Sequence, residues 1–198
     1  VAKITLHDLE NSLIDWAQFD VDAPVVLKAK KSLRKHQREA LKRVRNGFAS
    51  GEARGRLIMA CGTGKTFTSL RIAEDLAGKG RRVLFLVPSL SLLSQTLREW
   101  TQDSEIPLIN FAVCSDSDIG KHGKADDDRV FVRTSDLQFP ATTHAKSLAN
   151  AVAAHERHNG GAAMTVVYSP YHSIDVIHQV QAQYGLPEFD LIICDEAH

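Results

Sequence analysis

Met59-Ala60-Cys61-Gly62-Thr63-Gly64-Lys65-Thr66 directly follows the short apolar run Leu57-Ile58. An apolar run that leads into a Gly-rich turn is typical of a buried parallel strand, and the sequence after Lys65 predicts a helix. In a strand–turn–helix unit of this kind, the backbone N–H groups of the turn face phosphate groups and the lysine reaches the outer ones. The stretch therefore predicts a phosphate-binding loop that comprises Gly62, Thr63, Gly64, Lys65 and Thr66.

The loop departs from the full phosphate-loop pattern at its first position. That pattern begins with a glycine six residues before the lysine, and Met59 stands there. Cys61 is compatible with the loop because backbone amides, not side chains, surround the phosphates.

A second motif closes the sequence. Asp195-Glu196-Ala197-His198 follows the apolar run 191–194, which we interpret as another buried strand. An aspartate in this place shares a magnesium ion with the loop threonine, Thr66, and Glu196 is placed to orient or deprotonate the attacking water. Together with Lys65, these carboxylates predict an ATP-hydrolysing centre.

Apolar runs alternate with helical patterns along most of the chain. Strands are predicted at 56–59, 83–87, 109–114, 130–134, 165–168 and 191–194, and helices at 33–48, 66–77, 89–100, 145–158 and 173–184. This alternation indicates an α/β fold with helices on both faces of a mostly parallel sheet and ligands at the carboxyl ends of its strands. Residues 1–32 are expected to form a lead-in from an upstream domain, with a short helix over 6–19, and residues 33–198 the main domain.

Composition narrows the class of protein. Lys plus Arg and Asp plus Glu are equal at 24 each, so net charge does not indicate a polyanion partner. The basic stretch 28–45 is either a solvated helix face or an edge that faces phosphates. Three widely spaced cysteines give neither a disulfide framework nor a zinc pattern, and no stretch reaches the roughly 20 apolar residues of a membrane span. We therefore expect a cytoplasmic protein without a membrane partner. The first residue, Val1, and the end at His198 suggest a piece of a longer protein.

The two motifs together resemble motifs I and II of superfamily 2 helicases and translocases. In that family a glutamine upstream of motif I, in a Leu-Arg-x-x-Gln context, reads adenine, and Leu33-Arg34-Lys35-His36-Gln37 matches it. A glutamine amide donates and accepts at once, which suits the N6 amine and N7 of adenine. The resemblance implies that Arg34 and Gln37 bind the nucleotide.

Two further segments resemble the nucleic-acid side of these motors. Residues 87–95 are similar to motif Ia, and residues 168–173 to the segment near motif Ib. Hydroxyls and backbone amides at a helix start suit phosphate contacts that do not read sequence, and a well-capped helix without such contacts is the alternative explanation of 87–95. The implied nucleic-acid contacts are Pro88, Ser89, Ser91, Ser94, Gln95, Tyr171 and Ser173.

The finer resemblance, over residues 33–198, is to the single-polypeptide (type ISP) restriction–modification enzymes, with type I and type III motor subunits as near relatives. It rests on the strings 57–68, 83–89, 111–116 and 190–198. The resemblance implies the first RecA-like lobe of a motor that uses ATP and Mg²⁺ to move along double-stranded DNA. It also implies a second RecA-like lobe and nuclease, methyltransferase and target-recognition parts elsewhere.

Two other classes of function stay open from the residues alone. A different phosphate-loop enzyme, such as a small-molecule kinase, would leave Gln37 and residues 87–95 without a role. A non-catalytic module that only changes conformation with nucleotide would use the same loop without turnover.

Overall fold

The computed structural model describes residues 6, 9, 12–114, 141–142, 144–159 and 161–196. The chain divides into two compact units, Val1–Leu33 and Arg34–His198. The strand predicted at 130–134 lies outside the described residues. None of the described helices combines the length and the apolar character that a membrane span requires.

The described residues of the first unit contain little regular structure. Leu6 and Leu9 are helical, but the predicted helix over 6–19 does not extend to its expected end. Within the described residues 12–33 the one helical element is the 3₁₀ turn η1 (Trp16–Gln18), and Ile14 forms an antiparallel bridge with Leu27 instead. The Trp16 indole Nε1 donates to the Leu9 carbonyl at 2.7 Å, so local side-chain contacts replace the continued helix.

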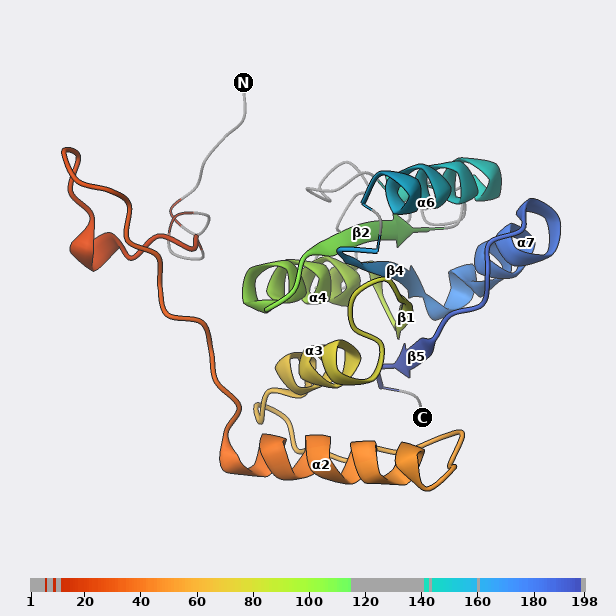
Figure 1. Ribbon diagram of the computed structural model, residues 1–198, viewed down its shortest axis with the longest axis horizontal. Coiled ribbons are helices and arrows are strands. Elements are labelled where there is room, and N and C mark those ends of the chain that lie inside the picture. The colour runs from red at the N-terminus through yellow and green to blue at the C-terminus, as the bar shows by residue number, and fades with distance from the viewer. Residues whose placement is uncertain are drawn as a thin grey trace, which may run out of the picture. The chain divides into compact units, whose positions relative to one another are not determined.

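The second unit is built on a five-stranded sheet in the order β3-β2-β4-β1-β5, with every pair parallel (Figure 1). Its strands are β1 (Arg82–Val87), β2 (Leu108–Val113), β3 (Ala141–Thr142), β4 (Met164–Pro170) and β5 (Leu191–Cys194). All residues of β4, the central strand, are buried. The strands predicted at 83–87, 109–114, 165–168 and 191–194 are thereby confirmed, and so is the α/β class.

Helices cover both faces of this sheet. They are α3 (Lys65–Leu76), α4 (Leu90–Asp103), α6 (Ala145–Asn159) and α7 (Ile174–Tyr184), the last preceded by the 3₁₀ turn η3 (Tyr171–Ser173). A further helix, α2 (Lys35–Ala49), packs against α3. Each corresponds to a predicted helix within a few residues. Local residue types determine where some of these helices begin or end. The Ser89 hydroxyl caps the N-terminus of α4 by accepting from the Leu92 amide, and Gly185 ends α7 in the left-handed conformation.

Successive side chains of a strand point to opposite faces of the sheet, so the sheet has a hydrophobic core on each face. Leu84 and Leu86 of β1 join a cluster with Leu148 and Val152 of α6 and Val180 of α7. On the opposite face, the ring of Phe85 lies against Trp100 of α4, with centroids 5.1 Å apart, and against Tyr168 of β4 at 6.0 Å. The result is the three-layer sandwich that the sequence predicts, with α3 and α4 on one face and α6 and α7 on the other (Figure 1).

The strand predicted at 56–59 is wrong. These residues have no strand partner, and Ile58 is 84% exposed. Leu57 and Met59 instead line a cavity together with residues of α2, so apolar contact with a helix replaces the backbone ladder. An apolar run of four residues satisfies either environment, which is why periodicity alone favoured a strand.

The expectation that residues 191–194 form a fully buried strand also needs correction. β5 is the edge strand of the described sheet, and its residues alternate between partly buried and exposed. Ile192 is 55% exposed and Cys194 is exposed.

Candidate nucleotide-binding site

The phosphate-binding loop is a tight turn that leads into α3. The backbone of Gly62 has φ +74° and that of Gly64 has φ +82°, a left-handed conformation that side chains disfavour. The Thr63 hydroxyl donates to the Ala60 carbonyl at 2.6 Å, and the Thr68 hydroxyl donates to the Gly64 carbonyl at 2.9 Å. The loop therefore has a defined shape, to which its own Thr63 hydroxyl and the Thr68 hydroxyl of α3 contribute.

Lys65 and Thr66 are the first two residues of α3. The first amides of a helix have no partner within it, and with the helix dipole they attract anions. Both side chains are partly buried at this end of the helix. The arrangement suits a phosphate chain at the α3 N-terminus with a cationic side chain beside it.

Asp195 lies next to this helix end. It follows β5, its amide donates to the Leu86 carbonyl at 2.9 Å, and α3 packs against β5. Partial burial and the neighbouring Glu196 carboxylate raise the pKa of Asp195, while the positive charge of Lys65 acts in the opposite direction. The fold thus brings Lys65 and Asp195, 130 residues apart in the sequence, within electrostatic reach of each other.

Glu196 occupies an unusual backbone conformation. Its φ is +52°, the only positive value at a described non-glycine residue, and its side chain is exposed. A non-glycine residue in the left-handed region marks a strained turn, and such turns often lie at functional sites. Ala197 and His198 lie outside the described residues.

The available donors suit magnesium. Among the described residues, no group of three or more His, Cys, Asp and Glu side chains could hold a metal ion. Mg²⁺ is usually bound through one or two carboxylates together with substrate phosphates and water, and the Asp195 carboxylate, which Lys65 influences from the start of α3, is a ligand of this kind.

Gln37 lies at the loop, but its amide is already hydrogen-bonded to the protein. Its Oε1 accepts from the Arg34 amide at 2.8 Å and its Nε2 donates to the Thr63 carbonyl at 3.0 Å. The side chain is 3% exposed. Arg34 is the residue before α2, so both nucleotide-binding residues implied by the resemblance lie at the N-terminus of that helix.

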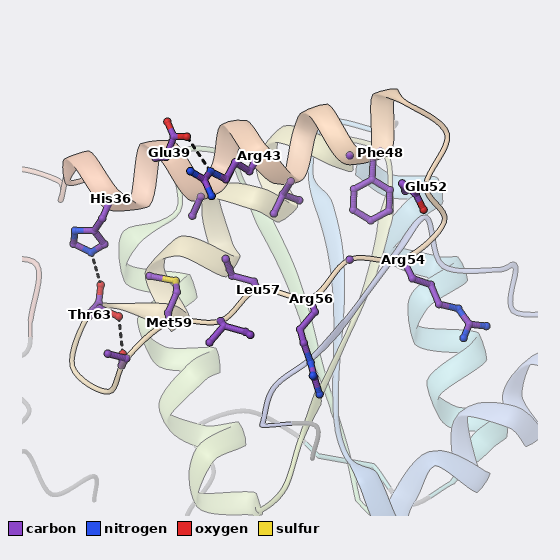
Figure 2. A pocket seen from close by; sticks show the side chains of 16 residues that line it. His36, Glu39, Arg43, Phe48, Glu52, Arg54, Arg56, Leu57, Met59 and Thr63 are labelled. Atoms are coloured by element: carbon purple, nitrogen blue, oxygen red, sulfur yellow. Dashed lines mark hydrogen bonds and ion pairs between the residues drawn. The ribbon is translucent and has the colours of Figure 1, made fainter.

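A cavity of about 550 Å³ opens beside the loop, between α2 and residues 52–63 (Figure 2). Its apolar lining includes Val44 and Phe48 of α2 and Leu57 and Met59 of the facing segment. Polar side chains also line it, among them His36, Glu39, Arg43, Arg54 and Arg56. His36 Nε2 lies 3.2 Å from the Thr63 carbonyl, so the cavity adjoins the loop, whereas Arg34 and Gln37 do not line it.

The residues expected on the nucleic-acid side fall into two groups. Pro88, Ser91 and Gln95 are exposed, Ser94 is partly buried, and Ser89 caps α4. All five lie at the carboxyl end of β1 or in the first two turns of α4. They therefore share one edge of the sheet with the phosphate-binding loop.

Tyr171 and Ser173 do not join that exposed group. Ser173 is 1% exposed, and the Tyr171 hydroxyl donates to the Asp195 carbonyl at 2.7 Å. Burial, followed by the nearby Cys194 and Asp195 side chains, raises the pKa of Tyr171 to about 12. This contact was not anticipated from the sequence, because the two residues follow different strands.

One further contact to the loop helix was missed. The Trp100 indole Nε1 donates to the Thr66 carbonyl at 3.1 Å, and this side chain is completely buried. Its spacing with Leu93 and Leu97 predicts a core position, but periodicity cannot show which carbonyl the indole reaches.

Comparisons with known proteins agree with this geometry. The family model described as "Type III restriction enzyme, res subunit" matches residues 30–198. No curated protein matches the chain. Among solved structures, the ATP-dependent Type ISP restriction-modification enzyme LlaBIII, bound to DNA, is 42% identical with a TM-score of 0.75 over 94% of this chain. A nuclease-deletion mutant of the Type ISP enzyme LlaGI, in complex with a DNA substrate mimic, is 43% identical with a TM-score of 0.70 over 85% of this chain.

This chain spans only 12% of the LlaBIII chain and 15% of the LlaGI chain. The match nevertheless includes the loop, β5 and every described helix from α2 to α7, because the family model extends from residue 30 to residue 198. The chain therefore belongs to the Type III restriction enzyme res-subunit family and carries its α/β lobe.

Proposed function

We propose that this chain is the ATP-binding lobe of an ATP-dependent DNA helicase or double-stranded DNA translocase, which acts as the motor of a restriction–modification enzyme. The observation that carries the proposal is the convergence of Lys65 and Asp195 at the carboxyl edge of the sheet. The likeness to LlaBIII and LlaGI, both described in contact with DNA or its mimic, supports the DNA partner.

Each residue predicted for the phosphate and magnesium site then has a role. The backbone of Gly62, Thr63 and Gly64 surrounds the phosphates, and Lys65 neutralises the outer ones. Thr66 and Asp195 hold Mg²⁺, which supplies charge stabilisation to the transferring phosphoryl group. Glu196 positions the attacking water.

The adenine end is assigned to the N-terminus of α2. Gln37 reads the base by exchanging its contact with the Arg34 amide or the Thr63 carbonyl for one with adenine, and Arg34 lies beside it. The capacity of an amide for simultaneous donation and acceptance supports this assignment.

The DNA side is assigned to the exposed residues 88–95. Contacts from hydroxyls and helix-start amides to phosphates carry no sequence information, so the motor binds DNA with little base preference and with an affinity that falls steeply with salt. Equal affinity at low and high salt would contradict a backbone-driven contact.

The remaining parts of the machine lie outside this chain. They are a second RecA-like lobe, a nuclease, a methyltransferase and a target-recognition part, in line with the small share of LlaBIII and LlaGI that is matched. Residues 1–32 are a lead-in from an upstream domain, and we place the motor in the cytoplasm, where ATP and DNA are both available.

A phosphate-release assay on the full-length protein tests the function. We expect turnover that double-stranded DNA stimulates, and none from residues 1–198 alone, because a second lobe supplies the arginine that is worth about 10³–10⁵ in rate in related enzymes. Phosphate transfer to a small acceptor without a DNA effect would indicate a kinase-like enzyme. Nucleotide binding without any turnover would indicate a switch module.

A further inference from the structure

Tyr171 and Asp195 follow two strands that do not pair with each other. β1 lies between β4 and β5, with Val87 opposite Pro170 and Leu86 opposite Cys194. Tyr171 comes one residue after β4, and Asp195 one residue after β5. Because neighbouring strands are about 4.8 Å apart, the two strand ends are separated by about 10 Å.

The Tyr171 side chain spans this separation. Its ring packs against the core cluster that includes Leu84 and Leu86, and its hydroxyl donates to the Asp195 carbonyl at 2.7 Å. The Asp195 amide donates to the Leu86 carbonyl at 2.9 Å on the other side of the same residue. The backbone of Asp195 is therefore held from β1 through its N–H and from the end of β4 through its C=O.

The position of Tyr171 in the chain links the turn after β4 to the backbone of Asp195. It is the first residue of η3, the turn that joins β4 to α7, and Ser173 at the end of that turn is buried. A rearrangement of η3 would displace the Tyr171 hydroxyl and remove one of these two restraints on Asp195.

We propose that Tyr171 is a positioning residue that ties the turn after β4 to the backbone of Asp195, and so sets where the Asp195 carboxylate presents itself to magnesium. This inference rests on the proposed function, in which Asp195 holds Mg²⁺ and the carboxyl edge of the sheet meets DNA. It replaces a direct DNA contact by Tyr171 with an indirect role: DNA that shifts η3 alters the magnesium site through the phenol.

The competing explanation is that Tyr171 only fills space in the core. Tyr171→Phe separates the two, because it keeps the ring and removes the hydroxyl. Tyr184→Phe is the matched control, since it removes the same group from the exposed last residue of α7.

The experiment uses the full-length protein and a fluorescent ATP analogue. Nucleotide affinity is measured with and without Mg²⁺, alongside the fold stimulation of ATP turnover by double-stranded DNA and the DNA affinity itself. For Tyr171→Phe we expect the magnesium-dependent gain in nucleotide affinity and the DNA stimulation each to fall about 3- to 10-fold, the scale of one hydrogen bond. The nucleotide affinity measured without Mg²⁺ should equal that of Tyr184→Phe, and so should the affinity for DNA.

Three outcomes would overturn the inference. Equal behaviour of the two variants in both magnesium and DNA assays would leave Tyr171 as a core residue. A parallel loss of DNA affinity would make it a direct DNA contact. A loss of nucleotide affinity that is as large without Mg²⁺ as with it would indicate general loosening of the fold.

Failure of the proposed function has a different signature. A wild-type protein without DNA-stimulated turnover contradicts the motor assignment, but the magnesium dependence of nucleotide binding still decides whether Tyr171 positions Asp195.

Discussion

The side-chain amide of Gln37 donates to the Thr63 carbonyl at 3.0 Å and thereby joins the first turn of α2 to the phosphate-binding loop. The side-chain oxygen of Gln37, Oε1, accepts a hydrogen bond from the Arg34 amide at 2.8 Å. A glutamine that is 3% exposed thus organises the loop before any base is present.

Replacement of Gln37 by Ala should affect both stability and nucleotide choice. The Arg34 amide would lose its acceptor and the Thr63 carbonyl one of its two contacts, at a cost of about 0.5–1.5 kcal/mol for each lost hydrogen bond. A site that no longer recognises the adenine edge should also discriminate less between ATP and GTP. Urea unfolding and competition binding measure the two effects, with the exposed Gln179→Ala as control. Unchanged discrimination would restrict Gln37 to a structural role.

Alanine at Gly64 should be more damaging than alanine at Gly62. Both glycines have positive φ, which costs other residues about 1–2 kcal/mol. At Gly64 a Cβ would also stand 2.6 Å from Gln37 Nε2, whereas at Gly62 nothing lies within 4 Å. Thermal unfolding should show the larger loss for Gly64→Ala, together with weaker nucleotide binding. Equal losses would mean that the amide of Gln37 is free to move aside.

Replacement of Lys65 by Ala should abolish ATP turnover in the full-length protein and leave the fold intact. Lys65 is partly exposed at the start of α3, so truncation removes charge without opening a core cavity. Phosphate release and circular dichroism measure the two properties, and Lys79→Ala in an exposed turn is the control. Hydrolysis at the wild-type rate would falsify the phosphate-binding assignment.

Replacement of Asp190 by Asn should destabilise the protein in a pH-dependent way. Partial burial opposes ionisation, but hydrogen bonds from the Arg82 amide and the Arg81 guanidinium, each 2.8 Å long, outweigh it and lower the pKa of Asp190. Because the folded-state pKa is depressed, the stabilisation is present above the unfolded pKa of about 3.9 and is lost as pH falls through the folded value.

The melting temperature of Asp190→Asn should therefore lie below that of the wild type at pH 7, and the gap should close in acid. Asp175→Asn, on the exposed first turn of α7, provides the comparison. A gap that persists below the folded pKa would assign the loss to geometry instead of charge.

The sequence by itself predicts the order of most strands and helices along the chain. Alternating apolar runs and helical stretches predict β1, β2, β4 and β5 and the helices from α2 to α7, because a short apolar run between two helical patterns indicates a strand of a parallel sheet, even where, as in β5, the strand is only partly buried. The loop at 62–66 was also readable, since only glycine adopts the left-handed backbone there without cost. These features depend on neighbours in the chain.

Tertiary structure decided the features that depend on distant partners. Residues 56–59 have the apolar pattern of a strand but pack beside α2. A strand forms only where its backbone can hydrogen-bond to a neighbouring strand, and an apolar run does not specify such a neighbour. The amide of Gln37 and the hydroxyl of Tyr171 each reach a carbonyl more than 20 residues away, a choice fixed by strand order and helix placement. The sequence thus predicts which residues bind a nucleotide, and the fold alone determined which backbone groups hold them in place, because hydrogen-bond partners are set by proximity in space.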